Sequence, residues 1–218
     1  MNIAIFTPNK NPYSETFIQA HKNYLKGNIF YFYGRNLGIR LEGSGVLVTP
    51  FRHNTIKLKR KLLQKSHSYV WEKMVLETLK KNNIQAILIE YGTHAYHLKG
   101  VLENVKIPVI VHFHGYDASQ KYVIKQCNKY KEVFQLATKV IAVSRVMEQR
   151  LKDLGCPEEK LVYNVYGPQP EFQSVVADYS KKQFIGIGRF VDKKAPYYTI
   201  LAFKDVLSKH SNAKLFLA

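Results

Sequence analysis

The sequence predicts an α/β fold built on a parallel sheet, because short apolar runs alternate with helical stretches along its 218 residues. Several of the runs are apolar at every position, as strands buried on both faces of a parallel sheet are. Each helical stretch then returns the chain to the start of the next parallel strand. The expected strands are residues 3–6, 29–33, 84–90, 109–113, 139–143 and 161–165.

Three helices between these strands are marked by start signals, apolar spacing and a stop signal. Ser14 is expected to cap the first, with Glu15 in its first turn, where the helix dipole favours an anion. The third runs from about 146 to 154 and ends at Gly155, a residue suited to a left-handed C-terminal position. The side chains that share a face are Phe17, His21, Tyr24 and Leu25 in the first helix and Trp71, Met74, Val75 and Leu79 in the second.

The chain changes character after residue 168. Residues 169–182 lack periodicity and are expected to form a linker between a first domain, 1–168, and the start of a second, 183–218. The second part predicts a strand at 184–188, a helix from Pro196 and a strand at 213–217. One β-α-β unit of this size cannot enclose a core, so we expect the chain to be the front part of a longer protein.

Composition indicates a folded, reducing-compartment protein with anionic partners. The two cysteines, Cys127 and Cys156, lack disulfide or zinc-ligand spacing, and no run resembles an export leader or a membrane span. We therefore expect a cytoplasmic location. The net charge of +17 raises affinity for phospholipid headgroups, nucleic acid or phosphorylated substrates, without choosing among them.

A basic stripe is predicted if residues 55–64 are helical, because Lys57, Lys61 and Lys65 then follow one another at four-residue spacing beside Arg60. Charge runs of this kind are as often an ordinary solvated face as a docking surface. The sequence leaves both interpretations open, a solvated helix or a surface that contacts an anionic membrane.

Ligands of open parallel sheets bind beyond the carboxyl ends of the strands, so the loops there carry the functional signal. The loop at 7–13 has no glycine, which disfavours an NAD or FAD site. His114 follows a buried strand together with Gly115 and Asp117, and can hydrogen-bond a sugar hydroxyl, a phosphate or only its own turn. His94 and His112 lie near other strand ends, but spacing gives these histidines no acidic partner, and no metal site is expected.

The strand at 184–188 ends in Arg189, and Lys194 follows five residues later, just before the helix that starts at Pro196. This arrangement directs two cations and a helix N-terminus at one spot. Such a spot suits a diphosphate group.

Four segments, in this order, resemble the family 4 retaining glycosyltransferases, and among them the bacterial enzymes of capsule, exopolysaccharide and lipopolysaccharide biosynthesis. The segments are Ser-Glu-Thr-Phe-Ile at 14–18, His-Gly-Tyr-Asp at 114–117, Val-Ile-Ala-Val-Ser at 140–144 and Gly-Arg-Phe-Val-Asp-Lys-Lys at 188–194. The resemblance implies the GT-B fold, in which two Rossmann-like domains face each other across a cleft. It implies an acceptor mainly on the first domain and a nucleotide-sugar donor mainly on the second.

The same resemblance implies roles for individual residues. Arg189 and Lys194, with Gly188, would hold the donor diphosphate, and His114 would contact the donor sugar near the reacting carbon as the catalytic residue. Cations placed there stabilise the negative charge that develops on the departing nucleoside diphosphate. The residues expected to line the acceptor side of the cleft are Ser14, Glu15, Gly115, Asp117 and Ser144.

The resemblance further implies a UDP- or GDP-sugar donor, a lipid-linked or saccharide acceptor, no cofactor and no metal. It implies that the sugar transfer takes place at the inner face of the cytoplasmic membrane. The chain departs from the family at Ala195, where glycine is usual, and at Tyr166-Gly167, where Asn-Gly is usual. The family's E-x7-E element would lie beyond Ala218, so this piece is expected to be inactive by itself. The alternative is a non-catalytic basic module that binds nucleic acid through lysines, arginines and aromatic rings.

Overall fold

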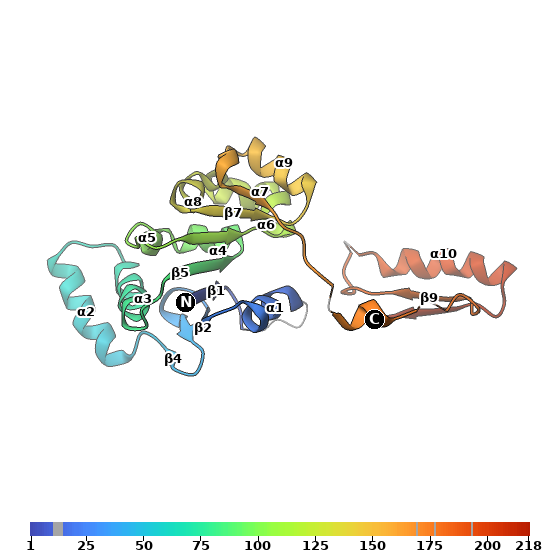
Figure 1. The fold of residues 1–218 in the computed structure, drawn as a ribbon, viewed down its shortest axis with the longest axis horizontal. Coiled ribbons are helices and arrows are strands. Elements are labelled where there is room, and N and C mark those ends of the chain that lie inside the picture. The colour runs from blue at the N-terminus through green and yellow to red at the C-terminus, as the bar shows by residue number, and fades with distance from the viewer. Residues whose placement is uncertain (11–14, 169, 177, 193) are drawn as a thin grey trace. The chain divides into compact units, whose positions relative to one another are not determined.

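The computed structural model describes residues 1–10, 15–168, 170–176, 178–192 and 194–218 (Figure 1). The expected cap Ser14 lies outside these residues. The chain divides into two compact units, Met1–Tyr166 and Gly167–Ala218, which we call the first and the second unit.

The first unit is built on an eight-stranded sheet with the order β4-β3-β2-β1-β5-β6-β7-β8. Six neighbouring strands of this order, β2, β1, β5, β6, β7 and β8, pair in parallel, which confirms the predicted α/β class. Two short strands, β3 and β4, extend one edge in antiparallel fashion and were not expected, since two-residue strands have no readable period. The strands are β1 (Asn2–Thr7), β2 (Asn28–Tyr33), β3 (Arg40–Leu41), β4 (Gly45–Val46), β5 (Ala86–Glu90), β6 (Val109–His112), β7 (Lys139–Ala142) and β8 (Leu161–Tyr163).

Helices join these strands and flank the sheet (Figure 1). The helices are α1 (Thr16–Tyr24), α2 (Pro50–Leu62), α3 (Tyr69–Lys81), α4 (Gly92–His97), α5 (Lys99–Leu102), α6 (Gly115–Ser119), α7 (Lys121–Gln126), α8 (Lys131–Leu136) and α9 (Arg145–Asp153). Short 3-10 turns follow at η1 (Asn36–Gly38), η2 (Asn128–Tyr130), η3 (Glu158–Lys160) and, in the second unit, η4 (Pro170–Ser174).

Apolar periodicity explains α3 and α9. The predicted face of α3 is buried, including Trp71 and Met74, with Glu72 in the first turn and lysines in the last, as the helix dipole favours. At α9, Gly155 follows the helix with φ +96°, a conformation that only glycine adopts without strain. Both predicted helices are therefore confirmed.

The two faces of the sheet bury separate clusters. Ile87 and Ile89 belong to the larger core, whereas Leu88 of the same strand joins a smaller core that α1 covers through Ile18. The predicted face of α1 is wrong in its C-terminal half, because Tyr24 is 70% exposed and Leu25 lies after the helix. Strand side chains on the α1 side of the sheet therefore pack into the smaller of the two cores.

The second unit contains β9 (Gln183–Gly186), α10 (Pro196–Lys209) and β10 (Lys214–Leu217), and the two strands pair in parallel. Both predicted strands and the helix are confirmed, with Pro196 at the first helical position, where its missing N–H needs no partner. None of the helices among the described residues combines the length and the apolar character that crossing a bilayer requires.

Candidate active site

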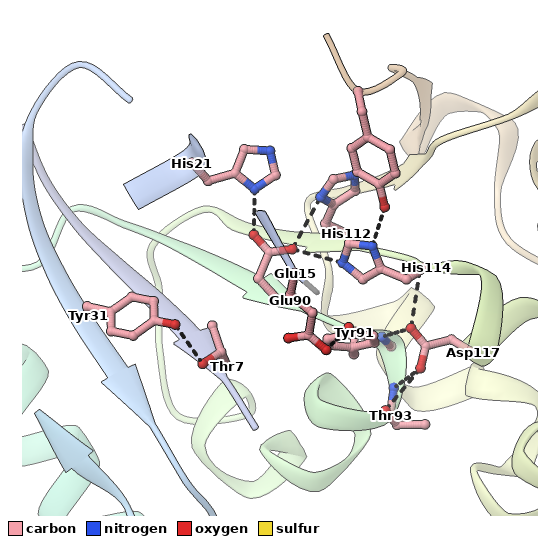
Figure 2. Close-up of polar contacts among 12 residues, drawn as sticks. Thr7, Glu15, His21, Tyr31, Glu90, Tyr91, Thr93, His112, His114 and Asp117 are labelled. Carbon is pink, nitrogen blue, oxygen red and sulfur yellow. Dashed lines mark hydrogen bonds and ion pairs between the residues drawn. The ribbon is translucent and has the colours of Figure 1, made fainter. Parts of the chain in front are cut away.

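The polar centre of the first unit lies where β5 and β6 end. Glu90 is the last residue of β5 and His112 the last of β6, and the two are register partners in the sheet. Two residues later, His114 leaves the strand and becomes the N-cap position of α6. His21 comes from α1, on the same side of the sheet (Figure 2).

Glu90 is fully buried and gathers the three histidines (Figure 2). His21 Nδ1 donates to Glu90 Oε1 at 2.6 Å, and His114 Nε2 donates to Glu90 Oε2 at 2.9 Å. His112 Nδ1 lies 3.3 Å from the same Oε2. A carboxylate can accept several bonds, so one buried side chain lies against residues from α1, the end of β6 and the start of α6.

The pKa values of this group favour an ionised Glu90 beside a neutral His114. Burial opposes the charge on Glu90, but the nearby His112 ring and the hydrogen bonds from His114 and His21 outweigh it and hold the pKa of Glu90 well below its usual value. Burial lowers the pKa of His114, and the hydrogen bond to Glu90 offsets that only in part. At neutral pH His114 is therefore an uncharged ring with one N–H.

That N–H is directed at Glu90, so His114 Nδ1 accepts a hydrogen bond from the Tyr166 hydroxyl. Burial raises the pKa of Tyr166, which keeps its proton available. The rings of Phe17 and Tyr91 pack against the imidazole at centroid distances of 4.5 and 4.4 Å. Both nitrogens of His114 are thus engaged within the first unit.

Tyr91 connects this centre to Glu15. Its backbone has φ +77°, a strained conformation for a non-glycine residue of the kind that collects at functional sites. The Tyr91 hydroxyl donates to Glu15 Oε1 at 2.5 Å, while Glu15 Oε2 is buried with no hydrogen-bond partner among the described residues. Glu15 therefore keeps one acceptor oxygen unused beside the cluster.

Asp117 connects the segments that follow β5 and β6. It is fully buried and accepts hydrogen bonds from the backbone N–H groups of Gly92 at 3.0 Å and His114 at 3.3 Å, and from the Thr93 hydroxyl at 3.0 Å. Burial raises the pKa of Asp117 to about 6, and these hydrogen bonds act against that rise. The structure places Asp117 beneath the loops, whereas its neighbour Gly115 borders open space.

Two other residues singled out in the sequence, Ser144 and His94, make no hydrogen bond or ion pair with Glu90 among the described residues. Ser144 is exposed and caps α9, accepting from the Met147 N–H at 3.1 Å. His94 is fully buried in α4, and its ring centroid lies 6.2 Å from that of His97. Ser144 therefore has a structural role at the start of α9.

The basic stripe also differs from its prediction. Because α2 ends at Leu62, Lys65 lies outside the helix, while Lys57 and Lys61 are exposed on it. The apolar side chains beside them are unexpectedly exposed, Leu58 to 63% and Leu62 to 76%.

In the second unit, the predicted phosphate-binding residues border one small cavity of about 90 Å³. Gly188, Arg189 and Lys194 line it together with Pro196, so it lies at the start of α10 and past the end of β9. A Cβ on Gly188 would contact the Lys194 side chain at 3.7 Å. The structure thus brings the two cations to one pocket.

Sequence reasoning missed Glu90 and Tyr166 as partners of His114, and His21 as a partner of Glu90. They stand far apart in the chain, and no spacing rule joins them. One signal was present, since Glu90 is a carboxylate that ends an otherwise apolar strand, and buried charges occur only where partners neutralise them.

No protein-family model matches this chain. The chain is 30% identical over 111 residues to WcaL of Salmonella typhimurium, whose name assigns it to colanic acid biosynthesis as a glycosyltransferase; the match spans 49% of this chain and 27% of WcaL. It is 28% identical over 98 residues to the amylovoran biosynthesis glycosyltransferase AmsK of Erwinia amylovora, spanning 43% of this chain and 23% of AmsK. The matched segments thus cover about a quarter of each relative.

Two solved structures share the fold. The lipopolysaccharide outer core galactosyltransferase WaaB matches all of this chain and 68% of its own with a TM-score of 0.57 and 12% identity. The S. aureus MnaA–UDP structure matches 99% of this chain and 61% of its own with a TM-score of 0.51 and 12% identity. These likenesses define the fold class as GT-B, and the sequence similarity is to glycosyltransferases of polysaccharide biosynthesis.

Proposed function

We propose that this chain belongs to a retaining glycosyltransferase that moves a sugar from a nucleoside-diphosphate sugar to a lipid-linked or saccharide acceptor in cell-surface polysaccharide biosynthesis. The observation that carries the proposal is the pocket of the second unit, where Arg189 and Lys194 meet the start of α10. The similarity to WcaL and AmsK supports the substrate class.

The chemistry of that pocket suits the leaving group. Breaking a glycosyl–phosphate bond leaves negative charge on the diphosphate. Fixed cations and a helix N-terminus stabilise this charge more in the transition state than in the ground state. Arg189 offers a planar fork that can bind two phosphate oxygens, and Lys194 adds a compact charge. In this proposal these groups neutralise the diphosphate without a metal cofactor.

In the first unit, His114 would contact the donor sugar and Glu15 the acceptor. Glu90 then acts as a positioning residue that fixes the tautomer of His114. Because the Tyr166 hydroxyl occupies His114 Nδ1, a sugar hydroxyl that donates to this nitrogen must displace it. Glu15 Oε2, which has no hydrogen-bond partner among the described residues, is an acceptor for an incoming hydroxyl.

The diphosphate assignment is tested by titrating the chain with UDP and with GDP and following ³¹P NMR signals. Arg189→Ala and Lys194→Ala are each expected to weaken binding about tenfold, the loss of roughly 1.4 kcal/mol for one charge-assisted contact. Lys204→Ala is the matched control, since it removes an exposed lysine of α10 that does not line the pocket. Equal affinity in all three variants and the parent would refute the assignment.

We also propose that α2 contacts an anionic membrane surface. We define the α2 docking surface as the exposed lysines and leucines on and after this helix, which are Lys57, Leu58, Lys61, Leu62, Leu63 and Lys65. Exposed leucines among lysines fit the boundary of headgroups and acyl chains better than bulk water, and Arg60 adds charge beside them. This combination favours docking over the solvated-face interpretation.

Co-sedimentation with vesicles tests the docking surface. Lys57→Glu with Lys61→Glu should reduce binding to vesicles that contain acidic lipid by at least about tenfold, at roughly 1 kcal/mol per lysine near the surface. Lys121→Glu with Lys125→Glu on α7 keeps the spacing and the charge change, and should bind like the parent chain. Equal losses in both variants, or equal binding to neutral vesicles, would remove the docking proposal.

Tight, salt-sensitive binding to single-stranded DNA without UDP or GDP binding would favour the nucleic-acid alternative.

A further inference from the structure

We infer that His21, Glu90 and His112 form a binding site for one divalent transition-metal ion. One ligand atom from each residue can be chosen so that all three lie within 4.8 Å of one another. Tetrahedral zinc with bond lengths near 2.1 Å needs ligand atoms about 3.4 Å apart, so small side-chain rotations suffice. The inference goes beyond the proposed glycosyl transfer and does not depend on it.

The donor set selects the class of ion. Two imidazoles and one carboxylate suit zinc and its late first-row neighbours, whereas magnesium and calcium prefer oxygen ligands alone. Glu90 supplies the carboxylate oxygen of the set, which is an established type of zinc ligand beside histidine nitrogen. Three protein ligands leave a further position for water or another small ligand.

His112 supplies the observation that points to an ion. It is 2% exposed, and neither ring nitrogen has a hydrogen-bond partner among the residues that the structure describes. Its Nδ1 is 3.3 Å from Glu90 Oε2, but the angles do not form a hydrogen bond. An unpaired buried nitrogen is costly, and a bound ion would satisfy it.

The sheet fixes two of the three proposed ligands, and the third lies on a helix that is partly exposed. Glu90 and His112 end adjacent, register-paired strands, so their spacing is fixed by the sheet. His21 closes the set from α1 with a side chain that is 24% exposed, which leaves a route for the ion. Sequence spacing offered His112 and His114 no acidic partner, and that premise was wrong, because Glu90 of the neighbouring strand is the partner.

The competing explanation is a hydrogen-bonded network with no ion. The 2.6 Å separation of His21 Nδ1 and Glu90 Oε1 is a hydrogen-bond distance and would lengthen on metal binding. His114 shares Glu90 Oε2, so an ion at this site would compete with His114 for the carboxylate.

The test uses the whole chain without a polyhistidine tag, stripped with a chelator and titrated with Zn²⁺ by calorimetry and with Co²⁺ by visible absorption. We expect one ion per chain and the d–d bands of four-coordinate Co²⁺. His21→Ala and His112→Ala should each weaken Zn²⁺ binding at least about tenfold, since even outer partners of a metal ligand are worth that much.

His67→Ala is the control, because His67 is exposed and remote in sequence from the three ligands. It should leave the affinity unchanged. Should His112→Ala fail to fold by circular dichroism, His21→Ala on the partly exposed α1 still decides the matter. Absence of Zn²⁺ binding by the parent chain, or the same affinity in His21→Ala as in the parent, overturns the inference and favours the hydrogen-bonded network.

Discussion

The two units carry the same β-α-β pattern, but only the first encloses a core. Nearly all buried apolar side chains of the described residues belong to it, with Ala213 as the second unit's contribution. In the second unit, Ile185 and Ile187 are 68% and 78% exposed although they lie in or beside a strand. A two-stranded sheet with one helix covers too little surface for independent stability. The apolar sequence pattern therefore predicts the strands and helices of both units, whereas the stability of a unit depends on how much of its apolar surface other elements bury.

The largest expected effect contrasts one isoleucine from each unit. Ile89→Ala should lower the free energy of unfolding by about 2–5 kcal/mol, because Ile89 is fully buried in the larger core and its loss leaves a cavity. Ile185→Ala in β9 should change it by less than about 0.5 kcal/mol. Urea unfolding followed by circular dichroism measures both. Similar losses at the two positions would show that the second unit has a closed core of its own.

The pH dependence of the first unit follows from buried polar groups in its core. Burial lowers the pKa of His94 to about 3, and the charges of Arg35 and His97 act in the same direction. The unfolded chain then binds this proton more readily than the folded one. The contribution of His94 is therefore present above about pH 6.5 and is lost as the pH falls toward 3.

Between pH 7 and 5 this loss amounts to about 2 kcal/mol. His94→Phe removes the titrating ring and should flatten the decline, which urea unfolding at the two pH values can measure. Asp117, with its pKa raised to about 6, has the opposite sign, since its contribution is lost as the pH rises toward 6. Asp117 is present in both proteins, so their difference isolates His94. Parallel declines in parent and variant would contradict the assignment.

The start of α9 in the first unit can be compared with the start of α10 in the second. At α9, Ser144 Oγ accepts a hydrogen bond from the Met147 N–H. Ser144→Ala should therefore cost about 1 kcal/mol of the free energy of unfolding. Ser44→Ala, at an exposed turn of the same unit, is the control and should stay within about 0.5 kcal/mol. A null effect at Ser144 would mean that solvent replaces the cap without loss.

The sequence predicted the strands because apolar runs report burial directly. The strand expected at 84–90 is β5, Ala86–Glu90, and the shift is confined to its start. The sequence predicted individual residues of the site within single loops, but not which of these loops meet. His114 and Glu15 were singled out, but Glu90, His21 and Tyr166 join them through the sheet order, which brings distant positions to one edge. That convergence is a property of topology, and no local period encodes it.

The smallest expected effect concerns the second helix start, where Ala195 precedes α10 with φ +46°. A left-handed conformation costs an L-residue about 1–2 kcal/mol, and glycine avoids this cost while losing more entropy on folding. Ala195→Gly should therefore stabilise α10 by about 0.5–1 kcal/mol, seen as slower amide hydrogen exchange along the helix. Ala202→Gly, the same substitution inside α10, should instead speed exchange, at a cost of about 1 kcal/mol. If both variants exchange faster than the parent, the strain at Ala195 does not limit the stability of the second unit.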